Sequence, residues 1–376
     1  MASPAAPSYP AWGPGEGTAN MVVTIVVNDD HDDPSCDPAA EARVDVLRVV
    51  EAVRSALSSA GHEVVIRAVG ADFMGALQLV PRDAPDVVFN LCESLSGDAR
   101  GEAVVAGALE QLGLAFTGSP ALALGLALHK DKAKALLRGS AVLTPDWHYL
   151  PEGATGISGC PAYPVIVKPA REDASIGISF GSVADDLEAL REAVHRVWRM
   201  HQPALVERFV EGREFCVSFL GNAPRVVLPL REISFGPSFA GRPRIVSYLA
   251  KWDPSTLEFR DTTSSPCELP PETESRVIEC ARRAFEVLGC RDYGRVDVRL
   301  DSNGTPYVID VNPNCDLHPD AGFARAAKGA GMDYASLVAT LLENALERAR
   351  PHSPGRAAPR AGAGAAVSAD RELHTR

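Results

Sequence analysis

The stretch from Tyr293 to Asn312 restricts the fold most, because it alternates like two strands joined by a tight turn. Asn303 and Gly304 form the strongest short-range hairpin signal, since both positions of the favoured turn need a positive φ. A two-residue loop at these positions places Asp297 opposite Asp310 in the paired strands. We therefore expect an antiparallel hairpin in which two acidic side chains lie directly across from each other.

Facing acids in a sheet need a counter-charge, because like charges about 5 Å apart at Cβ repel each other. The same register places Asn312 opposite Arg295 on the polar face. The apolar side chains point to the other face, namely Val296, Val298, Leu300, Ile309 and Val311. Two carboxylates and an amide carbonyl are hard oxygen ligands, which suit Mg²⁺. Taken alone, the pattern also fits a solvated hairpin face with alternating charges.

The composition is that of an ordinary globular protein. The chain has 376 residues, of which 46% are hydrophobic and 23% charged, and this length is ample for two or three domains. A formal net charge of −12 argues against nucleic acid or an anionic membrane surface as a partner. We find no apolar stretch long enough to span a membrane, so we expect no membrane partner.

The two ends and the cysteines indicate a cytoplasmic protein. Residues 1–20 are rich in Ala, Pro and Gly, have no basic or apolar signal region, and are expected to be a disordered tail. Residues 349–376 turn to Ala, Gly, Arg and Pro and are expected to be disordered as well. Eight scattered cysteines form no CxxC pair, which suggests neither a zinc site nor a disulfide framework. A reducing cytoplasm is the expected location.

Strands and helices alternate in the first third of the chain. Apolar runs predict strands at 22–27, 62–69 and 86–91, and helical spacing predicts helices at 44–57 and 102–112. This alternation is typical of a parallel sheet with right-handed crossovers, so 21–120 reads as an α/β domain. Further strands are expected at 163–169, 204–210 and 214–220, and a long polar segment at 235–266 is expected to be a functional loop, such as a lid.

Several charged residues outside the hairpin are each weak signals alone. Lys168 ends a strand beside a loop that contains Ser175 and Gly177, and such small residues let phosphate approach closely, although many loops contain them. Lys132 fits a solvated helix face. Glu207 and Glu214 lie seven residues apart across a strand–turn–strand and fit surface charges.

Taken in order, these residues resemble the ATP-grasp enzymes, and within them the D-alanine–D-alanine ligase group. The matching segments are 89–94, 116–119, 131–132, 165–171, 206–215 and 293–314, so the resemblance covers roughly 22–345. It implies an α/β fold in which an N-terminal parallel-sheet α/β domain precedes two α+β subdomains that sandwich ATP. The implied ranges are 21–120 for the first domain, 121–203 for the central subdomain and 204–348 for the C-terminal one.

The resemblance also implies a role for each matching residue. Those that bind ATP would be Lys132, Lys168, Ser175, Ile176, Gly177, Glu207, Val210, Glu214 and Lys251. Within this set the lysines and the 175–177 loop hold phosphates, Glu207 and Val210 hold adenine, and Glu214 holds the ribose. Asp297, Asp310 and Asn312 would bind Mg²⁺, with Mn²⁺ as a substitute. Arg295, Lys251 and Ser175 would be catalytic.

The implied reaction is ATP-dependent ligation of a carboxylate to an amine. Phosphoryl transfer from ATP makes an acyl phosphate, the amine attacks it, and Arg295 is placed to stabilise the resulting oxyanion. The substrates would be amino acids or a peptide, and a homodimer is expected. Two alternatives stay open: a ligase for a different amino acid, peptide or metabolite, and an inactive nucleotide-binding protein.

The residues that contact amino-acid substrates in the ligase group differ in this chain. The group has a Gly-rich turn and a Ser-x-Glu after its first strand, where this chain has the acidic loop 28–33. It has Pro-Gly after the metal-binding asparagine, where this chain has 314–316 as Asn-Cys-Asp. Ala321-Gly322 replaces Ser-Leu, and Trp252 stands where Tyr is frequent. The residues implied to bind ATP therefore match the group, whereas the residues at the positions that contact amino-acid substrates differ from it.

Overall fold

The computed structural model describes residues 9, 20–29, 40–157 and 159–349. Its first sheet is parallel, with strand order β2-β1-β3, as the alternating sequence predicts. The elements of this part are β1 (Val22–Asn28), α1 (Ala40–Ser59), β2 (Glu63–Val69), α2 (Phe73–Leu79), β3 (Val87–Asn90) and α3 (Gly101–Gln111). Six of the seven residues of β1 are buried and the seventh is half-buried, as expected for a central parallel strand covered on both faces. The acidic loop 30–33 and most of both predicted tails lie outside the described residues.

The second sheet is antiparallel, with strand order β4-β7-β5-β6. Its elements are β4 (Trp147–Leu150), β5 (Val165–Pro169), β6 (Val183–Ala184), α6 (Leu187–Trp198) and β7 (Ala204–Arg208). Helix α6 is capped by Asp186, whose carboxylate accepts from the Ala189 N–H at 2.9 Å. The helix then packs an apolar face of Leu190, Val194 and Val197 against this sheet. Strand β7 follows the expected boundary at 203, and the domain boundaries remain predictions.

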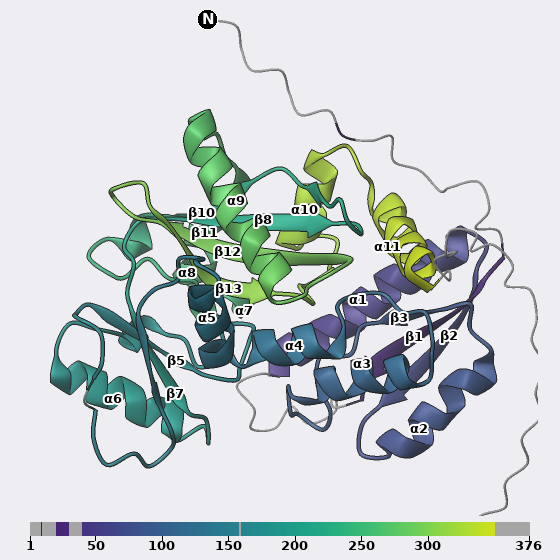
Figure 1. The fold of residues 1–376 in the computed structure, drawn as a ribbon, viewed down its shortest axis with the longest axis horizontal. Coiled ribbons are helices and arrows are strands. Elements are labelled where there is room, and N and C mark those ends of the chain that lie inside the picture. Colours follow the sequence, from purple (N-terminus) through teal and green to yellow (C-terminus); the bar gives the residue numbers. More distant parts are fainter. Residues whose placement is uncertain (1–8, 10–19, 30–39, 158, 350–376) are drawn as a thin grey trace, which may run out of the picture.

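The third sheet has six strands in the order β11-β10-β8-β12-β13, with β9 paired to β8. Its strands are β8 (Arg213–Leu220), β9 (Val226–Val227), β10 (Arg231–Phe235), β11 (Thr262–Pro266), β12 (Tyr293–Leu300) and β13 (Pro306–Asn312). Helix α9 (Pro271–Val287) lies along this sheet in Figure 1 and buries Val277, Ala281 and Phe285 in the core beneath it. The two later sheets and the first one form three separate parts of the molecule in Figure 1.

The segment expected to be a long polar loop is more ordered than its sequence indicates. It contains α7 (Tyr248–Trp252), α8 (Leu257–Asp261) and the edge strand β11. Each helix is one short turn whose N-terminus is capped by a hydroxyl, that of Ser247 for α7 and that of Thr256 for α8. Such short elements leave no periodic pattern, which is why the sequence favoured a loop.

The hairpin has the predicted acid pair but a different turn. Asp297 lies opposite Asp310 and Arg295 opposite Asn312, which confirms the predicted pairing. Leu300, however, lies opposite Pro306, so the predicted two-residue loop is wrong. The carboxylate of Asp301 accepts from the backbone N–H groups of the residues two and four further on, which tightens a longer turn. A bulge beside Asp310 restores the predicted register.

The bulge also changes which apolar residues of β13 reach the core. The predicted alternation buried Ile309, but the structure buries Val308 instead and places Ile309 on a cavity wall. The bulge inserts one extra residue in β13, so the residues between the bulge and the turn are shifted by one position. A shift of one position moves a side chain to the opposite face of the sheet.

The remaining helices join the parts of the molecule. Helices α4 (Ala121–Leu128) and α5 (Lys130–Gly139) follow the first domain, and α10 (Gly322–Gly329) and α11 (Tyr334–Ala349) end the described chain. Helix α11 lies beside α1 (Figure 1), and its Leu337 and Leu341 share one core cluster with Ile25 of β1. None of the described helices is long and apolar enough to cross a membrane.

Candidate active site

Two adjoining cavities lie between the sheets. The larger has a volume of about 550 Å³ and is lined by residues of both antiparallel sheets, among them Lys168 and Asp297. The smaller, of about 480 Å³, is lined by residues of the first domain, of α4, of the loop after β5 and of the chain that follows β13. Lys251, Trp252 and Arg295 line both cavities, so the two cavities meet at these side chains.

The predicted metal ligands lie together on the wall of the larger cavity. Asp297, Asp310 and Asn312 all line it, and the Asn312 side-chain N–H donates to Asp297 Oδ2 at 3.2 Å. Within the described ranges no group of three His, Cys, Asp or Glu side chains could hold a metal by itself. Two carboxylates and an amide fit Mg²⁺, which commonly takes few protein ligands and fills its octahedron with waters and phosphate oxygens.

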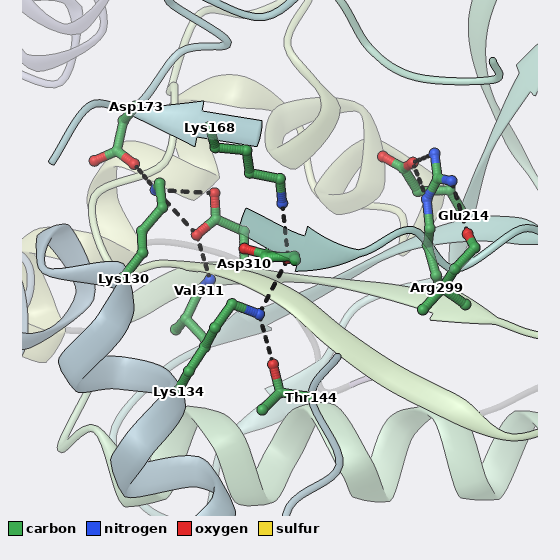
Figure 2. Close-up of polar contacts among 11 residues, drawn as sticks. Lys130, Lys134, Thr144, Lys168, Asp173, Glu214, Arg299, Asp310 and Val311 are labelled. Carbon is green, nitrogen blue, oxygen red and sulfur yellow. Dashed lines mark hydrogen bonds and ion pairs between the residues drawn. The ribbon is translucent and has the colours of Figure 1, made fainter. Parts of the chain in front are cut away.

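The lysine of α5 that lines the larger cavity is Lys130, and the structure does not bring Lys132 into that cavity. Lys132 is 67% exposed and pairs with Asp131 at 2.9 Å. Lys130 is buried, with its Nζ 2.6 Å from Asp173 and 3.3 Å from both oxygens of Asp310 (Figure 2). Residues two apart on a helix point to opposite sides, so only one of these lysines can face the cavity. We replace Lys132 by Lys130 in the candidate site.

Charge balance keeps Lys130 and Asp310 ionised in this setting. Burial opposes the positive charge, but Asp173 and Asp310 together raise the pKa of Lys130. Burial likewise opposes the negative charge of Asp310, and Lys130 and Lys168 together lower its pKa. The cavity wall therefore carries a fixed cation next to a fixed anion, as a site for both phosphate and a metal requires.

Glu207 also lines the cavity, and one of its oxygens is held while the other is free. It is only 1% exposed, and its Oε2 lies 3.3 Å from the Nζ of Lys168 and 3.2 Å from the Nζ of Lys134. Its Oε1 is buried without a hydrogen-bond partner in the described part of the chain. Burial lowers the pKa of Lys134 to about 8 despite the attraction of Glu207. A buried acceptor that lacks a partner is costly, so Oε1 marks where a ligand N–H belongs.

Glu214 and Val210 also line the cavity, and both are bonded to Arg299. Arg299 Nη2 lies 2.7 Å from Glu214 Oε2, and its Nη1 donates to the Val210 carbonyl at 2.9 Å. Figure 2 shows Glu214 and Arg299 at the right of the view, apart from Lys130 and Asp310.

The loop after β5 closes one side of the cavity. Ser175 and Ile176 line it, whereas Gly177 lies in the loop behind them. Gly177 has φ +77°, and a Cβ there would meet Met200 Sδ at 2.8 Å, so both its conformation and its packing require glycine. Trp252 donates from Nε1 to the Ala174 carbonyl at 2.9 Å, which fastens α7 to this loop.

Arg295 forms a bidentate pair with Asp297, with Nε 2.7 Å from Oδ1 and Nη2 2.9 Å from Oδ2. It thus lies beside the metal acids and at the junction of both cavities, as the hairpin pattern predicts. Lys251 lines the same junction, and burial followed by repulsion from Arg295 lowers its pKa. The predicted site residues other than Lys132 therefore surround one cavity or the loop that bounds it.

Comparison with known proteins identifies the family. The family model described as "D-ala D-ala ligase C-terminus" matches residues 141–343, more than half of the chain. A D-alanine–D-alanine ligase of Chromohalobacter salexigens is 34% identical, covering 73% of this chain and 82% of the relative. An uncharacterized protein of Sinorhizobium fredii is 33% identical, covering 80% of this chain and 88% of the relative.

The chain belongs to the D-alanine–D-alanine ligase family. A crystal structure of the D-alanine–D-alanine ligase from Bacillus anthracis complexed with ATP has the same fold, with a TM-score of 0.68 at 21% identity over 88% of this chain and 99% of that one. The predicted ATP-grasp fold and the predicted class, an ADP-forming carboxylate–amine ligase, are thereby confirmed.

This ligase-family chain contains three charged residues at the site that sequence reasoning missed, namely Lys130, Lys134 and Arg299. Lys130 and Lys134 are four residues apart, a spacing that places both on one helix face and Lys132 on the opposite face. That spacing could have identified them. Arg299 follows Asp297 by two residues on β12 and therefore shares its face, which was a usable signal as well.

The smaller cavity is lined in part by Asn314, Cys315 and Asp316, which follow β13. Asn314 bridges its wall: it accepts from the Tyr293 hydroxyl at 2.6 Å and donates to Glu102 Oε1 at 2.7 Å. Glu93 and Asp316 lie on the same wall. This wall is thus acidic and polar, with Arg295 as its positive counterpart.

Proposed function

We propose that this enzyme binds ATP with Mg²⁺ in the larger cavity and joins two amino-acid substrates, or an amino acid and a peptide, in the smaller one. One observation carries the proposal: the acid pair, Lys130, Lys168 and the partnerless Glu207 oxygen surround a single cavity. A nucleotide carries groups that match them, namely a base amine and a triphosphate.

The adenine end is supported by Glu207. Lys134 and Lys168 hold its Oε2, so Oε1 is free to accept a hydrogen bond from the exocyclic amine of adenine. Val210 continues the chain past Glu207 and Glu214 lies across the turn, where they suit the adenine edge and the ribose. Guanine carries a carbonyl in place of that amine, so Glu207 favours adenine over guanine.

The phosphate end is supported by the charges around Asp310. Lys130 and Lys168 would contact the phosphates, and Asp297, Asp310 and Asn312 would hold Mg²⁺. When bound, the metal would neutralise phosphate charge that builds up during transfer. The Ser175–Ile176 backbone would cover the phosphates, since this loop lines the cavity.

The reaction proceeds in two steps that this chain's residues organise. A substrate carboxylate oxygen attacks the γ-phosphorus, the bond to the β,γ-bridging oxygen breaks, and ADP leaves an acyl phosphate. The amine then attacks the acyl carbon, loses a proton, and inorganic phosphate departs. Arg295 and Lys251 lie where both cavities meet, so they would hold the reacting carboxylate and stabilise the oxyanion of the second step.

The substrates are tested by a phosphate-release screen with ATP, Mg²⁺ and pairs of D- and L-amino acids. Relatives named D-alanine–D-alanine ligase make D-alanine the first substrate to try. Robust release with D-alanine alone supports that specific activity, and release only with another pair assigns a different amide. ADP binding without release for any pair or peptide would leave a nucleotide-binding protein and contradict the ligase proposal.

We also propose that the enzyme works in the cytoplasm, as a homodimer. The seven cysteines in the described ranges are all free, which fits a reducing compartment. The dimer rests on the resemblance to the ligase group, and the elution volume of the purified chain with light scattering tests it.

A further inference from the structure

Arg299 is a buried cation that ties three segments together at one end of the larger cavity. It is only 4% exposed, and its Nε and Nη2 lie 3.0 and 2.7 Å from Glu214 Oε2. Its Nη1 donates to the Val210 carbonyl at 2.9 Å, and Nη2 also donates to the carbonyl of Arg244. Figure 2 shows the guanidinium directly against the Glu214 carboxylate.

These three acceptors belong to different parts of the chain. Val210 follows β7, Glu214 is the second residue of β8, and Arg244 precedes the segment that leads into α7 and Lys251. The guanidinium also lies over the ring of Phe209, 5.0 Å from its centroid, so the ring limits its movement. A rigid planar donor with this many fixed partners holds them in one relative position.

Arg299 binds one carboxylate oxygen of Glu214 and leaves the other able to accept a hydrogen bond. Oε2 accepts two hydrogen bonds from Arg299, and no hydrogen bond from the described part of the chain reaches Oε1. The residue lines the larger cavity. Glu207 shows the same division, since cations hold its Oε2 and its Oε1 has no partner. In both cases a buried cation orients a carboxylate whose other oxygen is left for a ligand.

We propose that Arg299 is a positioning residue for the nucleotide ribose: it fixes the Glu214 carboxylate so that Oε1 accepts a ribose hydroxyl. This inference rests on the proposed nucleotide site. Arg299 acts through Glu214 and need not touch the nucleotide. A purely structural ion pair would stabilise the fold without affecting which sugar is bound, and this difference makes the inference testable.

The test measures binding of Mg²⁺-ADP and Mg²⁺-2′,3′-dideoxy-ADP by calorimetry to the full chain, so no amino-acid substrate is needed. The wild type is expected to prefer ADP by about tenfold or more, the worth of a hydrogen bond to a charged group. In Arg299→Met, ADP binding should weaken about tenfold while dideoxy-ADP binding weakens less than about threefold, so that the preference disappears.

Arg213→Met is the matched control. Arg213 forms a similar bidentate pair with Glu232 on the same sheet, at 2.8 and 2.7 Å, but does not line the cavity. It should keep the wild-type preference. Arg299→Lys keeps the buried charge but loses the planar fork, and serves if the methionine variant fails to fold. It too should lose most of the preference.

Two results overturn the inference. One is an unchanged ADP preference in a folded Arg299 variant, and the other is an equal loss of affinity for both nucleotides. Failure of the wild type to bind ADP is distinguishable, because it appears before any variant is compared. That result overturns the proposed nucleotide site and this inference with it.

Discussion

Asp310 is the residue on which most of the proposed chemistry converges. It lies opposite Asp297 across the hairpin and 3.3 Å from the Nζ of Lys130. Its carboxylate therefore belongs both to the proposed metal site and to the phosphate-binding group. Loss of this one side chain should remove the metal while leaving the apolar face of the hairpin unchanged.

We predict that Asp310→Ala lowers Mg²⁺-dependent turnover by at least about 100-fold, equivalent to about 3 kcal/mol, because metal stabilisation of the transferred phosphoryl group is lost. Phosphate release from ATP with a productive substrate pair measures it. Circular dichroism and the thermal midpoint should show a folded protein. Full activity in this variant would refute the metal assignment.

The two lysines of α5 make a matched pair of variants. Lys130→Met should lower kcat/KM for ATP by about 100-fold or more, because a cation that contacts phosphate is lost. Lys132→Met should change it less than about twofold, since that side chain is exposed and pairs with its neighbour Asp131. Equal losses in both variants, or a larger loss in the second, would restore Lys132 to the site.

At the scale of elements, the closure of the cavity depends on contacts between loops. Trp252 of α7 donates to the Ala174 carbonyl in the loop after β5, at 2.9 Å. The same loop carries Ser175 and Ile176, and α7 carries Lys251, so this contact brings two groups of site residues into one arrangement.

We predict that Trp252→Phe raises KM for ATP about three- to tenfold, because one hydrogen bond of about 1 kcal/mol that holds the loop closed is lost. The thermal midpoint should stay within about 2 °C, since the ring stays apolar. Trp198→Phe is the control: its ring nitrogen is buried without a hydrogen-bond partner in the described structure. An unchanged KM in the first variant would contradict the role of this contact.

The elements also show where sequence reasoning succeeded and failed. The parallel sheet and the acid pair followed from β-branched runs and from strand alternation, which are strong local signals. The predicted turn of the hairpin was wrong, because the Asp301 side chain accepts hydrogen bonds from the backbone, which the Asn-Gly signal does not reveal. The longer turn shifts the pairing by one residue, and the bulge beside Asp310 shifts it back. The acid pair was therefore predicted correctly although neither the turn nor the bulge was foreseen.

At the scale of the whole molecule, the site is built from segments that only the tertiary fold brings together. Lys130 and Asp310 are 180 positions apart, and Arg299 and Val210 are 89 apart. Alternation and helix spacing predict which face a side chain occupies, but not which distant face it meets. The resemblance to a known family supplied that information for most of the site. It could not supply Arg299 or the exact lysine of α5.

The most direct test of the account is a crystal structure of the full chain with a non-hydrolysable ATP analogue and Mn²⁺, whose anomalous signal locates the ion. We predict a Mn²⁺ peak bound by the carboxylates of Asp297 and Asp310, with the adenine amine on Glu207 Oε1. An analogue bound elsewhere, or an ordered triphosphate in the cavity with no ion between these two carboxylates, would contradict the account.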